Sequence, residues 1–232
     1  MRVDGLIFDK DGTLFDFDAT WNQYTVSVIS YFAQGRAAQM ATIANVLGFD
    51  LSAMAYHPTS PVIAGTNRLV AELLASVVTT HDADEVERYL TQTAAQVKSV
   101  PAVPLAPYLR GLKNQGLKLA VMTNDSEFGA KSHLNDAGVS EYFEAIIGAD
   151  SGYGAKPDAD PLHAIAGLLS LDPAQLVMVG DSTHDLLAGK RAGMRTIGVL
   201  TGVADSTELS PYADFIFDDI GGVTDWLKTV NT

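Results

Sequence analysis

The chain begins with a short apolar run that ends in acidic residues. Residues 3–8 are mostly apolar and lead into Asp9, Lys10, Asp11 and Gly12. A run of this length, bounded by polar and turn-forming residues, is typical of a buried strand that opens into a loop. The segment is therefore predicted to be a strand whose polar end lies at Asp9.

A helical pattern occupies residues 17–97. Apolar side chains recur there at spacings of three and four, first in the stripe Trp21, Tyr24, Val28 and Phe32. This spacing places them on one face of a helix. Further stripes lie at residues 40–47, 69–77 and 86–97, with Gly48, Pro58, Pro61 and Gly65 between them. The pattern predicts a bundle of about four helices.

The pattern changes near Pro101, where apolar runs begin to alternate with amphipathic stretches. The runs lie at residues 117–122, 143–147, 176–179, 196–200 and 215–217, and the amphipathic stretches at 105–113, 126–138, 158–169, 183–192 and 224–230. Alternation of strand and helix indicates a parallel sheet with helices on both faces. The predicted fold class is α/β: a Rossmann-like parallel sheet core of residues 1–16 and 98–232, with an inserted α-helical cap at residues 17–97.

Composition and charge narrow the class of protein. The 232 residues are 47% hydrophobic, which allows a large core, and include no cysteine, which excludes disulfides and thiolate metal sites. No secretory leader or membrane-length apolar run is present, so we expect a cytoplasmic protein without a membrane partner. The net charge of −13 disfavours nucleic acid as a partner. An anionic substrate would need local positive charge at its site.

Polar residues stand where three of the predicted strands end, at Asp9, Thr123 and Asp181. The carboxyl ends of parallel strands meet at one edge of a sheet, where ligands of such folds bind. Asp9 and Asp11 are two residues apart, so in extended backbone both carboxyls point to the same side. Gly12 then permits a tight turn. This edge of the sheet is the predicted site.

Each of these motifs has an ordinary structural explanation when it stands alone. The Asp-x-Asp-Gly segment also occurs in solvated turns and calcium loops, although the later ligands of an EF-hand do not fit this sequence. Thr123 suits a strand end, Lys156 a solvated loop, and Asp185 the first turn of a helix. The joint pattern is far more specific than any single motif.

Four segments in this order resemble the motifs of the haloacid dehalogenase (HAD) superfamily, and the phosphoglycolate phosphatase-like group within it. They are Asp9 to Leu14, Thr123-Asn124, Lys156-Pro157 and Gly180 to Asp185. The helical insertion resembles the C1-type cap of that superfamily. Lys10 departs from the pattern, because many of these phosphatases carry an apolar residue after the first aspartate.

The resemblance implies a magnesium-dependent phosphatase that acts on a small phosphorylated metabolite, either a phosphoglycolate-like compound or a sugar phosphate. Asp9 would be the nucleophile that forms an aspartyl-phosphate, and Asp11 the general acid and base. The implied Mg²⁺ ligands are the Asp9 carboxylate, the Asp11 carbonyl and the Asp181 carboxylate, with Asp185 as a ligand or as support. The implied phosphate-binding residues are Gly12, Thr123, Asn124 and Lys156.

Several alternatives stay open at this point. A phosphomutase of the β-phosphoglucomutase type would share every motif residue and differ in the hydroxyl that receives the phosphoryl group. A non-catalytic binding or regulatory protein could also use this fold, whereas Asp11 argues against a dehalogenase. The candidate selectivity residues are Tyr56, His57, Asn67 and Arg68, around the loop at residues 58–65. Either a monomer or a homodimer is compatible with the sequence.

Overall fold

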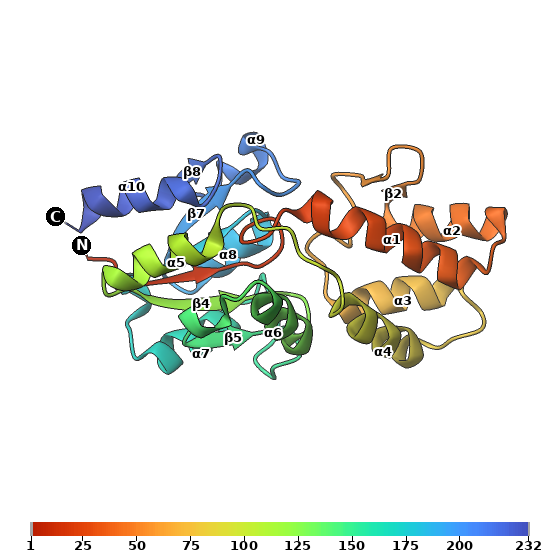
Figure 1. Cartoon of the computed structure of the whole chain (residues 1–232), viewed down its shortest axis with the longest axis horizontal. Helices are drawn as coiled ribbons and strands as arrows, with labels where there is room; N and C mark the ends of the chain where they lie inside the picture. The colour runs from red at the N-terminus through yellow and green to blue at the C-terminus, as the bar shows by residue number, and fades with distance from the viewer. Residues whose placement is uncertain (1, 232) are drawn as a thin grey trace.

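A six-stranded parallel sheet lies at the centre of the larger part of the molecule (Figure 1). The computed structural model describes residues 2–231. The strands are β1 (Gly5–Phe8), β4 (Lys118–Met122), β5 (Ala145–Ile147), β6 (Leu176–Gly180), β7 (Arg195–Val199) and β8 (Phe215–Phe217). They lie in the order β5-β4-β1-β6-β7-β8, and every neighbouring pair is parallel.

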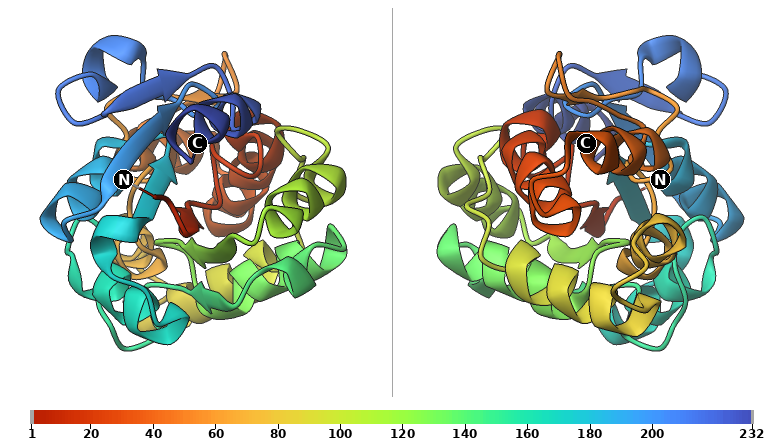
Figure 2. Two further views of the ribbon diagram at one scale, coloured as in Figure 1. Left: turned by 90° about the vertical axis from the view of Figure 1, so that its left-hand side faces the viewer. Right: turned by 90° about the vertical axis from the view of Figure 1, so that its right-hand side faces the viewer.

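Helices cover both faces of this sheet, as the views along the long axis show (Figure 2). One face packs against α5 (Leu105–Asn114), α6 (Glu127–Asp136) and α10 (Gly221–Val230), and the other against α7 (Asp160–Leu169) and α8 (Thr183–Arg191). Alternation along β1 shows why. Leu6 and Phe8 point into one buried cluster and Ile7 into the other, because successive strand residues face opposite sides. The predicted α/β fold is confirmed.

Local sequence signals account for most element boundaries in this part. The side chain of Ser126 accepts a hydrogen bond from the Gly129 N–H at 3.1 Å, as expected of the residue that precedes a helix. The last helix begins at Gly221 rather than at residue 224, and the four-residue helix α9 (Ser206–Leu209) was not predicted. Among the described residues, no helix combines the length and apolarity needed to cross a membrane.

Residues 17–97, here called the helical unit, lie at one end of the molecule (Figure 1), and four helices form most of this unit. They are α1 (Phe17–Ala33), α2 (Ala37–Leu47), α3 (Asn67–Val77) and α4 (Ala83–Ala94). Their apolar faces meet in a hydrophobic core of their own, which contains Ile29, Ile43, Leu74 and Leu90. The predicted helical pattern is confirmed, although it missed the two-residue strands β2 (Phe49–Asp50) and β3 (Ala55–Tyr56), which pair with each other.

The two chain passages between the sheet and the helical unit run side by side. Phe15 forms an antiparallel bridge with Pro101, and the N–H of Asp16 donates to the carbonyl of Val100 at 2.8 Å. A second bond runs from the Ala102 N–H to the Leu14 carbonyl at 3.0 Å. The helical unit is thus joined to the sheet by a short two-stranded connection.

Candidate active site

The sheet topology brings the predicted strand-end residues together. β1 lies between β4 and β6, so Asp9 stands directly between Thr123 and Asp181 at the carboxyl edge of the sheet. The three residues are 2–7% exposed. Asp9 is more than a hundred residues from Thr123 and Asp181 in the chain. The three residues nevertheless lie together, because neighbouring parallel strands end at the same edge of the sheet.

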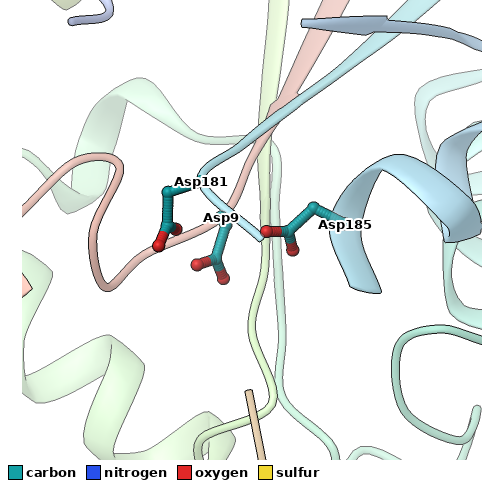
Figure 3. A group of neighbouring side chains, drawn as sticks. All are labelled: Asp9, Asp181 and Asp185. Atoms are coloured by element: carbon teal, nitrogen blue, oxygen red, sulfur yellow. The ribbon is translucent and has the colours of Figure 1, made fainter. Parts of the chain in front are cut away.

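Three carboxylates form a compact buried group at this edge. One oxygen from each of Asp9, Asp181 and Asp185 lies within 4.8 Å of the others, and the side chains face a common space (Figure 3). Asp185 is in the first turn of α8, where its Oδ2 accepts hydrogen bonds from the N–H and hydroxyl of Ser182. This reciprocal capping fixes the start of the helix and points the other oxygen toward the site.

Two glycines allow the backbone to approach Asp181 closely. Gly12 has φ +78°, and a Cβ there would lie 2.3 Å from Oδ2 of Asp181. A Cβ on Gly202, in the loop after β7, would lie 1.8 Å from the same oxygen. The hydroxyl of Thr13 donates to Oδ1 of Asp181 at 3.1 Å. The Asp181 carboxylate is therefore held between two loops.

Lys156 provides positive charge within this acidic group. Its Nζ lies 2.5 Å from Oδ1 of Asp9, 2.6 Å from Oδ1 of Asp185 and 2.9 Å from the carbonyl of Met122. Its side chain is 3% exposed. A charge buried to this degree must be paired, so Lys156 is a structural member of the site as well as a candidate phosphate ligand.

The acidic groups titrate abnormally because they are buried and close together. Burial raises the pKa of Asp9 to about 7, Lys156 opposes that rise, and Asp185 and Asp11 add to it. Burial likewise raises the pKa of Asp181, with further contributions from Asp9 and Asp185. Burial lowers the pKa of Lys156, but its two carboxylate partners more than offset this and the net direction is upward. One lysine does not neutralise three carboxylates.

A divalent cation fits this donor set. Mg²⁺ prefers oxygen ligands from carboxylates, carbonyls and water, and the three carboxylates can each offer one oxygen. They also carry more negative charge than Lys156 balances. Both the chemistry of the donors and the charge excess therefore suit a hard cation.

Asn124 joins the loops around the site. Its Oδ1 accepts from the Lys156 N–H at 2.9 Å, and its Nδ2 donates to the carbonyls of Lys156 and Ala64 at 2.9 and 2.8 Å. Both side-chain N–H groups are thus engaged in holding the Lys156 loop and the helical unit. Any contact of Asn124 with phosphate would come from its backbone, while the Thr123 hydroxyl accepts from the Asp125 N–H and keeps its own proton to donate.

The Asp11 carboxylate has a different environment from that of Asp9. Its Oδ1 accepts a hydrogen bond from Nε1 of Trp21 in α1 at 2.9 Å, and its Oδ2 lies 2.6 Å from Nζ of Lys10. Trp21 belongs to the apolar stripe of α1, and it reaches across to the loop after β1. The two acids of the first motif therefore face different partners.

Lys10, the residue that departs from the family pattern, is completely buried. Its Nζ also contacts Oδ2 of Asp125 at 3.2 Å and Nδ1 of His133 at 3.1 Å. Burial lowers the pKa of Lys10, but Asp11 and Asp125 more than offset this and hold it above its usual value. Lys10 thus connects the Asp11 loop to Asp125 and His133 in the protein interior.

His133 continues this network into the helical unit. Burial, with Lys10 nearby, lowers its pKa and keeps the ring neutral. Its Nε2 lies 2.8 Å from the carbonyl of Ala94, an acceptor, so Nε2 carries the proton and Nδ1 accepts from Lys10. Sequence reasoning missed this chain of contacts, whose one signal was a lysine between two site acids.

A cavity of about 120 Å³ lies between the carboxylates and the helical unit. Asp9, Asp11, Thr123, Lys156 and Asp181 line its core end. The helical unit contributes Phe17, Trp21, Tyr24, Thr25, Val28, Leu47, Tyr56, Val62, Ile63, Ala64, Gly65, Asn67, Val70, Leu90 and Ala94.

The four candidate selectivity residues divide into two pairs. Tyr56 and Asn67 line the cavity, as expected. His57 is exposed and absent from the lining, and Arg68 faces the outside, where it pairs with Glu72, Asp84 and Glu87. Arg68 therefore lies outside this cavity, because α3 turns its charged face away from it.

The chain matches the haloacid dehalogenase-like hydrolase family over residues 6–199. A phosphoglycolate phosphatase of Neisseria meningitidis is 44% identical over 99 residues, which are 43% of this chain and 42% of that protein. The chain therefore aligns with less than half the length of this relative. A phosphoglycolate phosphatase of Agrobacterium fabrum is 31% identical over 221 residues, which are 94% of this chain and 89% of that protein.

The fold is also found among solved structures. The crystal structure of a predicted phosphoglycolate phosphatase from Haemophilus somnus superposes with a TM-score of 0.74. The match covers 97% of this chain and 98% of that chain at 20% sequence identity. The similarity in fold therefore extends over the helical unit as well as the sheet.

Proposed function

Because the chain belongs to the haloacid dehalogenase-like hydrolase family, we propose that it is a magnesium-dependent phosphatase that hydrolyses a small phosphate monoester. One observation carries the proposal. Asp9 lies with Asp181, Asp185 and Lys156 in a buried group whose carboxylates suit a cation, whereas Asp11 is held apart by Trp21 and Lys10. Two acids in one loop, given different partners, suit two different tasks in catalysis.

Asp9 is the proposed nucleophile. One of its oxygens is bound by Lys156, and the other attacks phosphorus to form an aspartyl-phosphate while the ester P–O bond breaks. Protonated Asp11 gives its proton to the departing oxygen, which leaves as the neutral alcohol. Water then attacks the aspartyl-phosphate and loses a proton to Asp11. Inorganic phosphate leaves, and the Asp9 carboxylate is restored.

The remaining residues balance and orient charge. A Mg²⁺ held by the carboxylates of Asp9, Asp181 and Asp185, and by the Asp11 carbonyl, would supply charge neutralisation at the phosphate oxygens. Lys156 and the Thr123 hydroxyl can donate to those same oxygens, and the turn at Gly12 lets the backbone come close.

We also propose that residues 17–97 act as a cap over the site. The helical unit has its own hydrophobic core and supplies the wall of the cavity opposite the carboxylates. Such a unit excludes water from the reacting phosphate and contacts the alcohol portion of the ester.

The proposal is tested by metal removal together with trapping of the intermediate. Exhaustive chelation should abolish hydrolysis of p-nitrophenyl phosphate, and added Mg²⁺ should restore it. Mass spectrometry of acid-quenched reactions should then locate phosphate on Asp9. Full activity after chelation, or phosphate on a different residue, would contradict the mechanism.

A further inference from the structure

The wall that the helical unit gives to the cavity carries no charge. Aromatic side chains of Phe17, Tyr24 and Tyr56 and aliphatic side chains of Val28 and Ile63 form much of it, and none of its lining residues within the described chain is acidic or basic. The core end of the same cavity, in contrast, holds several carboxylates. A substrate therefore meets charge at one end and an apolar surface at the other.

Several side-chain polar atoms in this wall already have partners within the protein. The hydroxyls of Thr25 and Tyr56 lie 2.5 Å apart, and the hydroxyl of Tyr24 lies 2.8 Å from Oγ1 of Thr93. Nδ2 of Asn67 donates to Oδ1 of Asp125 at 3.1 Å. A ligand rich in hydroxyl groups would have to replace these bonds, because a polar group buried without a partner is unfavourable.

Positive charge is equally committed. Within residues 2–231, the basic side chains of the lining are Lys156, in a core loop, and His184, in the first turn of α8. Burial lowers the pKa of His184, which disfavours its charged form. Lys156 already contacts Asp9 and Asp185, and Arg68 lies outside the cavity among three acids. A carboxylate or second phosphate on the alcohol portion would face Asp11 and Asp125, whose partner Lys10 is completely buried and absent from the lining.

From these contacts we propose that the substrate is the phosphate ester of an uncharged, largely apolar alcohol, aromatic or branched aliphatic. This proposal rests on the proposed phosphatase function and names the class of ester. The phosphate binds at the core end, beside Lys156 and the carboxylates that would hold Mg²⁺, and the alcohol packs against the aromatic wall. Phosphoglycolate, pyrophosphate and sugar phosphates are poor substrates, because each brings charge or unpaired hydroxyls to the apolar end. The same argument disfavours a sugar-phosphate mutase.

Benzyl phosphate and 2-phosphoglycolate test the proposal directly. Both are esters of primary alcohols, so the comparison isolates recognition from the intrinsic reactivity of an aryl ester. With saturating Mg²⁺, kcat/KM for benzyl phosphate should exceed that for 2-phosphoglycolate by about 100-fold. Equal values, or a preference for 2-phosphoglycolate or glucose 6-phosphate, would overturn the assignment.

Binding separates this proposal from the function on which it rests. Benzylphosphonate and phosphonoacetate cannot be hydrolysed, so calorimetry with Mg²⁺ compares them whether or not the protein is a phosphatase. Tighter binding of benzylphosphonate, without turnover of any ester, would support the apolar cavity and refute the phosphatase. Hydrolysis together with tighter binding of phosphonoacetate would refute the substrate class and leave the phosphatase intact.

Position 63 allows a positive charge to be introduced into the cavity wall. Ile63 lines the cavity from a half-exposed loop and lies outside the hydrophobic core of the helical unit, so a longer side chain can be accommodated. Ile63→Lys should raise kcat/KM for 2-phosphoglycolate about tenfold and lower it for benzyl phosphate, whereas Ile63→Met should preserve the ranking. Identical rankings in the two variants would contradict the placement of the alcohol against this wall.

Discussion

The two ends of one cavity are built on opposite principles. At the core end, buried carboxylates and Lys156 are held by capping bonds, close glycines and ion pairs. At the end made by the helical unit, aromatic and aliphatic side chains form a neutral wall, and the hydroxyls of Tyr24, Thr25 and Tyr56 are bonded within that unit. On the proposed mechanism, the difference means that chemistry and selectivity are encoded in separate parts of the chain. Substitutions at the core end should slow every ester, and those in the wall should reorder them.

The largest expected effect is at Asp9. Asp9→Asn keeps the size of the side chain but removes the attacking oxygen, so turnover should fall on the order of 10⁴-fold or more for all esters. No phosphoenzyme should form. Steady-state assays and quenched-flow mass spectrometry measure both outcomes, and a wild-type circular dichroism spectrum serves as the control for folding. Normal turnover by this variant would remove the assigned nucleophile.

A smaller effect is expected at Asp11. Asp11→Asn leaves the nucleophile but removes the proton donor, a loss of roughly 10²- to 10⁴-fold for alkyl esters. An aryl ester with a good leaving group should lose much less in the first step and accumulate phosphate on Asp9. If alkyl and aryl esters lost the same factor, Asp11 would have a structural role rather than an acid-base one.

Trp21 lines the wall and bonds to Asp11 at the core end, so its replacement should lower kcat by less than the Asp11 variant does. Trp21→Phe keeps an aromatic ring in the wall but removes the donor to Oδ1 of Asp11. A lost bond to a charged group corresponds to about tenfold in kcat for an alkyl ester, with little change for p-nitrophenyl phosphate. Arg68→Ala is the matched control on the outer side of the unit and should leave kcat and the ranking unchanged. A reordered ranking in that control would place selectivity outside the cavity.

Metal binding should appear as a pH-dependent change in stability. Without a cation, Asp9 has a pKa of about 7 in the folded protein against 3.8 for the free side chain. Its protonation therefore stabilises the metal-free fold below about pH 4, and this contribution is lost as the pH rises through 7. Mg²⁺ competes with that proton, so saturating Mg²⁺ should raise Tm by on the order of 5 °C at pH 8 and by less at pH 5.

Differential scanning fluorimetry in the presence of chelator or Mg²⁺ makes this measurement. Asp181→Asn removes one of the three carboxylates and should abolish most of the Mg²⁺-induced rise in Tm at pH 8. A rise that is equal at both pH values, or unchanged in the variant, would place the cation elsewhere.

The sequence predicts the core end well because its signals are local. Apolar runs that end at Asp9, Thr123 and Asp181 mark strand ends, and a parallel sheet collects such ends at one edge. The acidic and hydroxyl side chains at these strand ends can therefore be located from local patterns in the chain.

The sequence predicts the contacts between distant segments poorly. Gly202 lies against Asp181 only because the loop after β7 folds back over Asp181, and no local pattern marks that glycine. Trp21 lies ten residues from Asp11, yet their bond depends on the rotation of α1 about its axis. Likewise, a buried Lys10 can be inferred only once Asp125 and His133 are placed around it.

The double connection between the sheet and the helical unit lowers the contact free energy that is needed to keep the two parts together. Three hydrogen bonds cross between them among the residues that line the cavity: Trp21 to Asp11, Asn67 to Asp125, and Asn124 to the Ala64 carbonyl. The bond to the Ala64 carbonyl joins neutral groups and is worth about 0.5–1.5 kcal/mol, and the two bonds to carboxylates are worth about 1.5–3 kcal/mol each, so the three total roughly 4–7 kcal/mol. Because both parts belong to one chain, their association is intramolecular and proceeds at a high effective concentration.

A few kcal/mol is then sufficient to keep the cavity shut. The corresponding ratio of closed to open molecules is roughly 10³ to 10⁵. On the proposed cap function, that ratio would exclude bulk water from the carboxylates for most of the time and still leave an open state that exchanges substrate and product. The tether would thus allow a small set of hydrogen bonds, with the bond between His133 and the Ala94 carbonyl beside them, to hold the two parts together and still release the alcohol.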